Sequence, residues 1–275
     1  MTLIAHLSDI HFGSELTGAA EALLEALNSA DYALVVLSGD LTMAARRSEF
    51  ELARAFVQAL RHPVLAVPGN HDVSPYRLHE RMVAPWRRWR RYINEELEPT
   101  WRNNNVAAVG INTARRMLAR FDWSHGSVSA AQMRALGLRF SALGPAALRI
   151  VVAHHPFLAE ETADLGTRPR VMVRRARKAL NAFAAAKVDL VLAGHLHRTY
   201  AARHEAVAST GGTVRPVTVV QAGTALSQRM RGETNSFNRI EVGDGVCAVH
   251  PMVLSAKGWE RQPTPLTQFH LAEKD

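Results

Sequence analysis

The stretch Val64-Leu65-Ala66-Val67-Pro68-Gly69-Asn70-His71-Asp72 joins a short apolar run to four residues that are poorly suited to a protein core. The apolar run predicts a buried strand. A glycine, an amide, an imidazole and a carboxylate follow at its end, which is where α/β sheets place their ligands. Asn-His-Asp is also acceptable turn chemistry after a strand. The rest of the chain therefore decides between a simple turn and a functional site.

The same pattern, an apolar strand that ends in polar residues, occurs twice before this stretch. Residues 3–7 lead into Ser8-Asp9-Ile10-His11, and residues 34–37 lead into Ser38-Gly39-Asp40. A helix is predicted over residues 17–30, between these two strands. Alternating strands and helices predict parallel strands with right-handed crossovers, so their polar ends should converge at one edge of a sheet.

Two further helices are predicted from the capping-box spacing, in which a Ser and a Glu or Gln three residues later satisfy the first backbone N–H groups. Ser48 and Glu51 have this spacing before one apolar helical face, and Ser129 and Gln132 have it before another. The basic segment 171–187 also predicts a helix, with its charges on a solvated face.

Apolar runs in the second half of the chain lead into histidines. Residues 149–153 are followed by His154-His155, and residues 188–193 by Gly194-His195-Leu196-His197. Strands are also predicted over residues 106–111 and 217–222, and a hairpin over residues 237–253. The chain after Ser255 is predicted to be irregular.

Five strand ends therefore carry residue types that bind metal ions. A single histidine at a strand end is more simply explained by an ordinary hydrogen bond, but five such ends in one chain favour a metal centre. Carboxylate, imidazole and amide oxygen together suit divalent Mn, Fe, Co, Ni or Zn. The set is too large for one ion and about sufficient for two. The candidate ligands are Asp9, His11, Asp40, Asn70, His154, His195 and His197.

In this order, the blocks Asp9-x-His11, Gly39-Asp40, Gly69-Asn70-His71-Asp72, His154 and Gly194-His195-x-His197 resemble the calcineurin-like metallophosphoesterase superfamily. Within it, Ser8-Asp9-Ile10-His11 and His154-His155-Pro156 look most like the bacterial class III cyclic-nucleotide phosphodiesterases. The resemblance implies an α/β (α+β) fold, a two-sheet β-sandwich flanked by helices. The strand and helix pattern alone predicts only a doubly wound sheet.

The resemblance also implies a role for each position. Asp9, His11 and His197 would bind a first metal ion. Asn70, His154 and His195 would bind a second, and Asp40 would bridge the two. His71 would act as general acid or as an electrostatic partner of the transition state, and Asp72 would orient His71. The choice of His154 over His155 rests on the family block.

The implied activity is a dinuclear-metal-dependent phosphodiesterase. Two ions about 3.5–4 Å apart share a water molecule and lower its pKa, and the metal-bound hydroxide attacks phosphorus. The expected substrates are cyclic nucleotides or similar small phosphodiesters. The alternatives are a hydrolase of nucleotide-linked lipid or sugar diphosphates, a nuclease, and a scaffold without activity.

Residues 75–102 interrupt the strand and helix alternation with interleaved arginines and tryptophans. They predict a helical cap inserted beside the site, within a single domain over residues 1–275. Such a mixture can bind phosphate and stack on a base, although buried tryptophans with solvated arginines explain it as well. Candidate substrate contacts are His125 in a loop, and Arg229 and Asn235 in a polar stretch.

The composition is consistent with these expectations. The chain has 275 residues, a formal charge of +8 and one cysteine, which excludes an intramolecular disulfide and a zinc site built from thiolates. No signal peptide is apparent, which favours a cytoplasmic protein. The positive charge is compatible with anionic substrates, nucleic acid or a membrane surface. Nucleic acid is not favoured because no separate binding module is present, and the resemblance is compatible with a homodimer.

Overall fold

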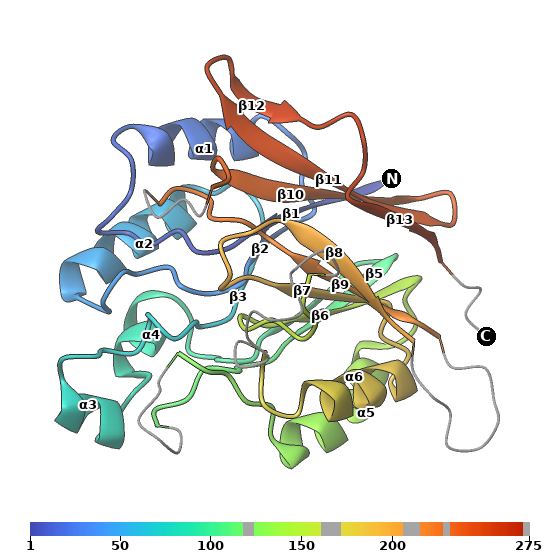
Figure 1. The fold of residues 1–275 in the computed structure, drawn as a ribbon, viewed down its shortest axis with the longest axis horizontal. Helices are drawn as coiled ribbons and strands as arrows, with labels where there is room; N and C mark the ends of the chain where they lie inside the picture. Colours follow the sequence, from blue (N-terminus) through green and yellow to red (C-terminus); the bar gives the residue numbers. More distant parts are fainter. Residues whose placement is uncertain (118–123, 161–171, 206–214, 228–231, 272–275) are drawn as a thin grey trace.

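The structure is a computed structural model that describes residues 1–117, 124–160, 172–205, 215–227 and 232–271 (Figure 1). Its strands form two sheets. The first sheet contains β1 (Thr2–Leu7), β2 (Leu34–Leu37), β3 (Val64–Ala66), β10 (Ser236–Gly243), β11 (Val246–Ser255), β12 (Gly258–Arg261) and β13 (Thr267–His270). The second contains β4 (Thr100–Arg102), β5 (Val106–Gly110), β6 (Leu148–Val152), β7 (Leu190–Ala193), β8 (Tyr200–His204) and β9 (Val217–Gln221).

Each sheet has a parallel part that carries polar residues beyond its strand ends. In the first sheet β1, β2 and β3 are parallel neighbours, and β10 pairs antiparallel with the other side of β1. In the second sheet β5, β6, β7 and β9 are parallel, with β4 and β8 antiparallel at the two edges. The parallel strands of both sheets therefore supply the loops of one common edge region.

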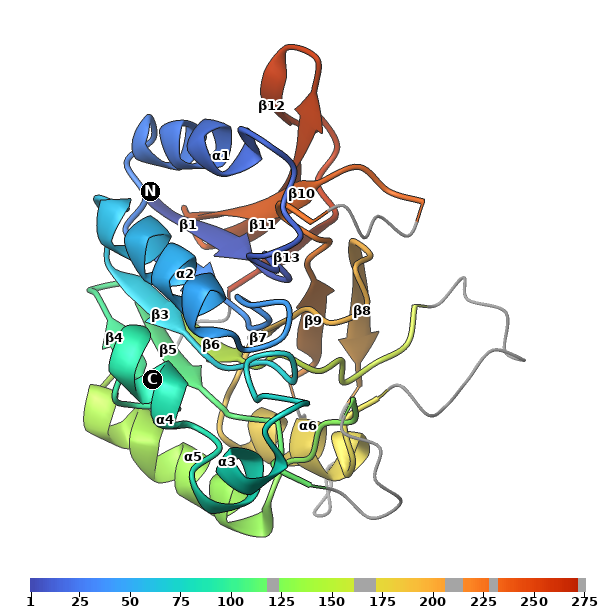
Figure 2. The ribbon, with the colours of Figure 1, turned by 90° about the vertical axis from the view of Figure 1, so that its left-hand side faces the viewer.

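Helices cover the outer faces of both sheets (Figure 2). The helices α1 (Ala19–Asn28) and α2 (Arg47–Ala59) pack on the first sheet, and α5 (Ala130–Leu143) and α6 (Ala176–Ala185) on the second. Side chains alternate along each strand, so Val36 of β2 faces the interior between the sheets while Val35 and Leu37 face the helices. The interior between the sheets is filled by aliphatic side chains such as Ile150 and Leu192.

The two-sheet sandwich flanked by helices is thus confirmed, whereas the single doubly wound sheet is wrong. The alternating pattern is the same in both halves of the chain, so it could not reveal that β1 to β3 and β5 to β9 belong to different sheets. The antiparallel pairing of β1 with β10 joins residues from opposite ends of the sequence. The expected irregular segment after Ser255 is also wrong, because it contains β12 and β13.

Of the two predicted capping boxes, the structure contains one. Ser129 and Gln132 form theirs: the Gln132 N–H donates to Ser129 Oγ at 3.1 Å, and the Ser129 N–H donates to Gln132 Oε1 at 2.7 Å. The box at Ser48 and Glu51 is wrong, because α2 already begins at Arg47. Glu49 instead accepts the Arg46 N–H at 2.9 Å, so the helix starts earlier than the sequence indicated.

Residues 75–102 form α3 (Leu78–Val83), α4 (Arg87–Tyr92) and then β4, which is an edge strand of the second sheet rather than part of a helical insertion. Trp89 is fully buried against the α2 side of the first sheet. Arg81 is also buried, and its guanidinium donates to the backbone carbonyl of Val73 at 3.0 Å. The segment is therefore anchored to the loop that follows His71. None of the helices described is long and apolar enough to cross a membrane.

Candidate metal centre

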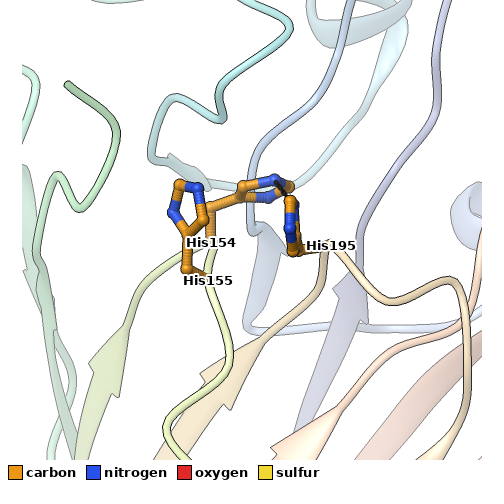
Figure 3. Close-up of side chains that lie close together, drawn as sticks. All are labelled: His154, His155 and His195. Atoms are coloured by element: carbon orange, nitrogen blue, oxygen red, sulfur yellow. Dashed lines mark hydrogen bonds between the residues drawn. The ribbon is translucent and has the colours of Figure 1, made fainter. Parts of the chain in front are cut away.

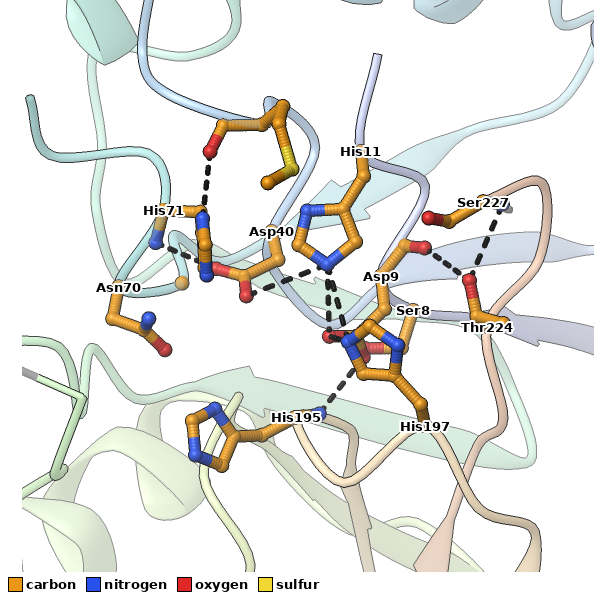
Figure 4. Close-up of polar contacts among 12 residues, drawn as sticks. Ser8, Asp9, His11, Asp40, Asn70, His71, His195, His197, Thr224 and Ser227 are labelled. Atoms are coloured by element: carbon orange, nitrogen blue, oxygen red, sulfur yellow. Dashed lines mark hydrogen bonds and ion pairs between the residues drawn. The ribbon is translucent and has the colours of Figure 1, made fainter. Parts of the chain in front are cut away.

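The strand-end residues lie together on loops that come from both sheets (Figure 4). Asp9 and His11 follow β1, Asp40 follows β2, and Asn70 follows β3. His154 follows β6, and His195 and His197 follow β7. The residues predicted to be ligands are thus brought to one place by both sheets.

One group consists of Asp9, His11 and His197, all buried. Asp9 Oδ1 lies 3.2 Å from His197 Nε2 and 3.6 Å from His11 Nε2. The two Nε2 atoms are themselves 3.2 Å apart. Three ligand atoms therefore point at a common position.

A second group surrounds Asp40. Its Oδ2 atom lies 3.2 Å from His154 Nε2 and 3.9 Å from His11 Nε2 of the first group. His154 Nε2 is also 3.2 Å from Asn70 Oδ1 and 3.3 Å from His195 Nδ1. Asp40 is consequently the carboxylate that contacts both groups, as a bridging ligand requires.

Hydrogen bonds to the backbone fix the orientation of two imidazoles. His154 Nδ1 contacts the Ser38 carbonyl oxygen at 2.8 Å, and His11 Nδ1 contacts the Thr42 carbonyl oxygen at 3.3 Å. A carbonyl accepts only from a protonated nitrogen, so the neutral rings carry their lone pairs on Nε2, toward the centre. Asp9 Oδ1 is buried there, and no residue that the structure describes forms a hydrogen bond with it. These donors fit a divalent cation, which would satisfy atoms that the protein leaves unsatisfied.

Burial and the neighbouring charges both shift the pKa values of the side chains at the centre. Burial alone would raise the pKa of Asp40, but His154 and His71 lower it below its usual range, so the carboxylate stays ionised. Burial lowers the pKa of His154, yet the adjacent Asp40 raises it to about 9. Burial and His154 together lower the pKa of His195 to about 3. The centre therefore attracts positive charge around its carboxylates.

Many of the predicted ligands adopt a left-handed backbone, which sequence reasoning did not foresee. The φ angles are 53° at Asp9, 53° at His11, 52° at Asp40, 77° at His195 and 57° at His197. Asp9 and His11 lie beyond the end of β1, so strand alternation does not explain why their side chains converge. Backbone hydrogen bonds to the β2 loop hold them instead, for example from the His11 N–H to the Asp40 carbonyl at 3.0 Å.

Close backbone packing at Gly69 completes this arrangement. A Cβ atom there would lie 2.1 Å from Asp40 Oδ1 and 2.4 Å from the Asp40 backbone nitrogen. Only glycine lets the loop after β3 approach Asp40 so closely. The glycine of the opening sequence stretch thus sets the distance between two ligand-bearing loops.

His71 lies beside Asp40 rather than among the ligand groups. Its backbone N–H donates to Asp40 Oδ1 at 2.8 Å, and its ring Nδ1 contacts the Met43 carbonyl oxygen at 2.6 Å. The ring stands edge-on to His11, with centroids 4.9 Å apart. The Met43 carbonyl, which sequence analysis did not identify, therefore orients the imidazole.

Asp72, which was expected to orient His71, does not contact the His71 ring directly. The Asp72 carboxylate accepts the N–H of Gly69 at 2.9 Å and both the N–H and hydroxyl of Thr42, at 3.0 and 2.9 Å. Burial and the negative Asp40 raise the pKa of Asp72 to about 6. Asp72 therefore ties the two loops together and shapes the backbone around His71, without contacting its ring.

The neighbouring histidines 154 and 155 differ in what their ring nitrogens contact. Figure 3 shows both beside His195. His155 Nδ1 contacts Thr113 Oγ1 at 2.8 Å, and its Nε2 contacts the Ser124 carbonyl oxygen at 3.0 Å. Both nitrogens of His155 are thus engaged by protein, whereas His154 Nε2 faces Asp40. This geometry favours His154 as the ligand.

Of the three candidate substrate contacts, the structure describes His125 and Asn235. Arg229 lies outside the described residues. Asn235 is buried, and neither atom of its amide has a hydrogen-bond partner in the described part of the chain. His125 is half-buried between Ser124 and Gly126, and both of these residues approach the His155 ring. The His125 loop therefore borders the centre on the side of the second sheet.

Comparisons with known proteins concern the fold and the family of this chain. A glycerophosphodiester phosphodiesterase, GpdQ of Enterobacter lignolyticus (strain SCF1), is 39% identical over 82 residues, but the match covers only 26% of this chain and 29% of that protein. The structure of PhoD superposes with a TM-score of 0.67 at 11% identity, covering 98% of this chain and 68% of that one. Purple acid phosphatase PPD1 from yellow lupin (Lupinus luteus) superposes with 0.64 at 13% identity, covering 94% and 52%.

These two structures share the fold. The sequence evidence comes from a family model, described as calcineurin-like phosphoesterase, that matches residues 2–199 and so includes every predicted ligand. The chain belongs to the calcineurin-like phosphoesterase family.

Proposed function

We propose that this chain is a phosphodiesterase that uses two divalent metal ions and acts on small phosphodiesters, cyclic nucleotides among them. Family membership supports the coarser statement, a hydrolase of phosphoesters. The observation that carries the proposal is the convergence of two buried carboxylates with imidazole lone pairs, in groups that meet at Asp40. The similarity to a glycerophosphodiester phosphodiesterase supports diesters over monoesters.

The ligand set divides into two overlapping groups. Asp9, His11 and His197 would hold one ion, Asn70, His154 and His195 the other, and Asp40 would be shared. The identity of the ions is left to measurement, with Mn, Fe, Zn, Co and Ni all compatible with these donors. When bound, such ions activate water and polarise the phosphoryl oxygens.

His71 would move a proton in this reaction. Its Nδ1 is engaged by the Met43 carbonyl, which leaves Nε2 as the nitrogen free to face a substrate. In the protonated ring, Nε2 carries a proton that it can donate to the leaving alkoxide. Asp72 contributes indirectly, because it fixes the backbone on both sides of the ring.

The proposal is tested by comparing turnover of three substrates by manganese-loaded protein: bis(p-nitrophenyl) phosphate, p-nitrophenyl phosphate and cyclic AMP. We expect higher kcat/KM on the diester than on the monoester, together with turnover of cyclic AMP. Diester turnover without cyclic AMP turnover would exclude the cyclic nucleotides and favour nucleotide-linked diphosphates or nucleic acid. Absence of turnover on all three, with two ions bound per chain, would contradict the proposal.

A further inference from the structure

A cavity rich in arginine lies beside the loops that carry His71 and Met43. It has a volume of about 550 Å³, and its lining includes six arginines and two tyrosines but no acidic residue. The arginines are Arg46, Arg47, Arg77, Arg87, Arg88 and Arg91. They come from the start of α2, the loop after β3, and α4. We refer to this cavity as the arginine pocket.

Four of these arginines lie within ion-pair distance of a carboxylate, and among them Arg87 Nε lies 3.9 Å from Glu80 Oε1. Arg88 forms two hydrogen bonds with Glu80, at 3.0 and 2.8 Å, and Arg47 contacts Glu51 at 2.8 Å. Arg46 lies 3.8 Å from Glu49.

Arg77 and Arg91 differ from them. Among the described residues, no carboxylate lies within ion-pair distance of either guanidinium. Arg91 instead lies over the Tyr92 ring, 5.6 Å from its centroid. The pocket thus holds two cations that a bound anion could pair with, and guanidinium forks match phosphate oxygens bidentately.

The pocket and the metal centre share two loops. Ala44 lines the pocket and directly follows Met43, whose carbonyl holds the His71 ring. Ser74 also lines the pocket and lies three residues after His71, a separation that spans at most about 11 Å even in extended chain. A single small molecule can therefore reach both places.

The size and the aromatic residues of the pocket indicate the kind of ligand. A volume of about 550 Å³ is in the range of small-molecule sites. Tyr76 in its wall is 75% exposed, so its ring face is available for stacking on a base. Tyr92 is less free, because it stacks on Phe50 with centroids 5.9 Å apart.

We propose that the arginine pocket binds a second phosphate of the substrate. This inference rests on the proposed function, because it takes the metal centre as the place of hydrolysis. It narrows the substrate class to small nucleotide phosphodiesters that carry a further phosphate, which Arg77 and Arg91 bind while the diester lies at the centre.

The test uses two substrates that differ only in the second phosphate: thymidine 5′-(p-nitrophenyl phosphate) and its 3′-phosphorylated form. We expect the native protein to prefer the 3′-phosphorylated form in kcat/KM. The double variant Arg77→Ala/Arg91→Ala should lower this preference by about tenfold or more, because hydrogen bonds between charged groups are lost. Arg77→Lys/Arg91→Lys should restore part of it.

The matched control is Arg54→Ala, an exposed arginine on α2 that is not part of the lining. It should leave the preference unchanged. An equal loss in the control, or no loss in the double variant, would overturn the proposal. Stronger competition by a single-stranded oligonucleotide than by the 3′-phosphorylated nucleotide would also overturn it, in favour of a nucleic-acid path.

A binding measurement separates this inference from the proposed function. Calorimetric titration of the full chain with inorganic pyrophosphate in the presence of a chelator examines the pocket without turnover. We expect binding to weaken by about tenfold or more in the Arg77→Ala/Arg91→Ala variant and to persist in Arg54→Ala. Absence of turnover on both thymidine substrates would contradict the proposed function alone, whereas unchanged pyrophosphate binding in the double variant would contradict the pocket.

Discussion

The two sheets contribute different chemistry to the metal centre. The loops of the first sheet supply both carboxylates of the candidate ligand set, Asp9 and Asp40, whereas the loops of the second supply only imidazoles to it. The negative charge and most of the neutral ligands thus come from separate halves of the sandwich. Removing Asp9 or Asp40 in the first half should alter the charge of the whole centre, whereas removing a histidine in the second should remove one neutral ligand.

Asp40→Ala should have the largest effect on metal binding and turnover. Because Asp40 contacts His11 and His154 of the two groups, its loss should release both ions and lower kcat/KM by at least about a thousandfold. Metal analysis of the purified variant and diester turnover measure the two losses. Asp31→Ala removes an exposed carboxylate and serves as control. Two ions per chain in purified Asp40→Ala would contradict this prediction, because metal binding would then not depend on the Asp40 carboxylate.

His71→Ala examines a residue of the first half that is not a ligand. It should keep both ions but lower kcat on an alkyl diester by about 10²–10⁴-fold, because a proton donor to the leaving alkoxide is lost. The loss should be smaller on bis(p-nitrophenyl) phosphate, whose leaving group needs no proton. Full turnover of the alkyl diester by this variant would exclude the general-acid role.

The adjacent histidines His154 and His155 in the second half give a sharper contrast. His154→Gln should weaken metal binding at one position and leave the other occupied. His155→Gln should retain both ions and instead destabilise the fold by about 1–3 kcal/mol, because Thr113 Oγ1 and the Ser124 carbonyl lose their partner. Metal content and urea unfolding separate these effects. Metal loss in His155→Gln alone would reverse the assignment.

The smallest expected effect concerns His6, an imidazole of the first sheet whose ring nitrogens contact Ser38 and Asn238. Burial lowers its pKa to about 3, so the folded state excludes a proton that the unfolded chain binds below about 6.5. Its contribution to stability is complete above pH 6.5 and is lost as the pH falls toward 3. His6→Gln should therefore reduce the slope of unfolding free energy against pH by up to about 1.4 kcal/mol per unit. Equal slopes for variant and native protein in urea unfolding between pH 4 and 6 would contradict this.

The convergence of the candidate ligands was predictable from the sequence because it depends on local patterns. Each apolar strand is short, and each leads directly into polar residues such as Asp40 or His154. The sheet pairing was not predictable in the same way. Strand β10 lies beside β1 through contacts between the two ends of the chain, and half-exposed strands such as β12 have no strong apolar pattern.

The remaining differences between the sequence-based predictions and the structure concern side chains whose hydrogen-bond partners are backbone atoms. Asp72 follows His71 in sequence, but its carboxylate faces N–H groups of the β2 and β3 loops. Nothing in the residue types around Met43 indicates that its carbonyl would hold an imidazole. The arginine pocket was also not predictable from the sequence. In the sequence, Arg47 and Arg77 resemble the chain's solvated arginines, and only the fold brings their three segments together.

The left-handed backbone at the ligand positions also has a consequence for the abundance of the protein. Each such conformation costs on the order of 1–3 kcal/mol, and five of them lie at one place, beside the buried Asp9 Oδ1 that has no hydrogen bond among the described residues. A cation that binds only this folded arrangement shifts the folding equilibrium by mass action, by about 2.7 kcal/mol at a hundred times its Kd. The supply of divalent metal would then govern the fraction of chains that escape degradation, in addition to their rate of turnover.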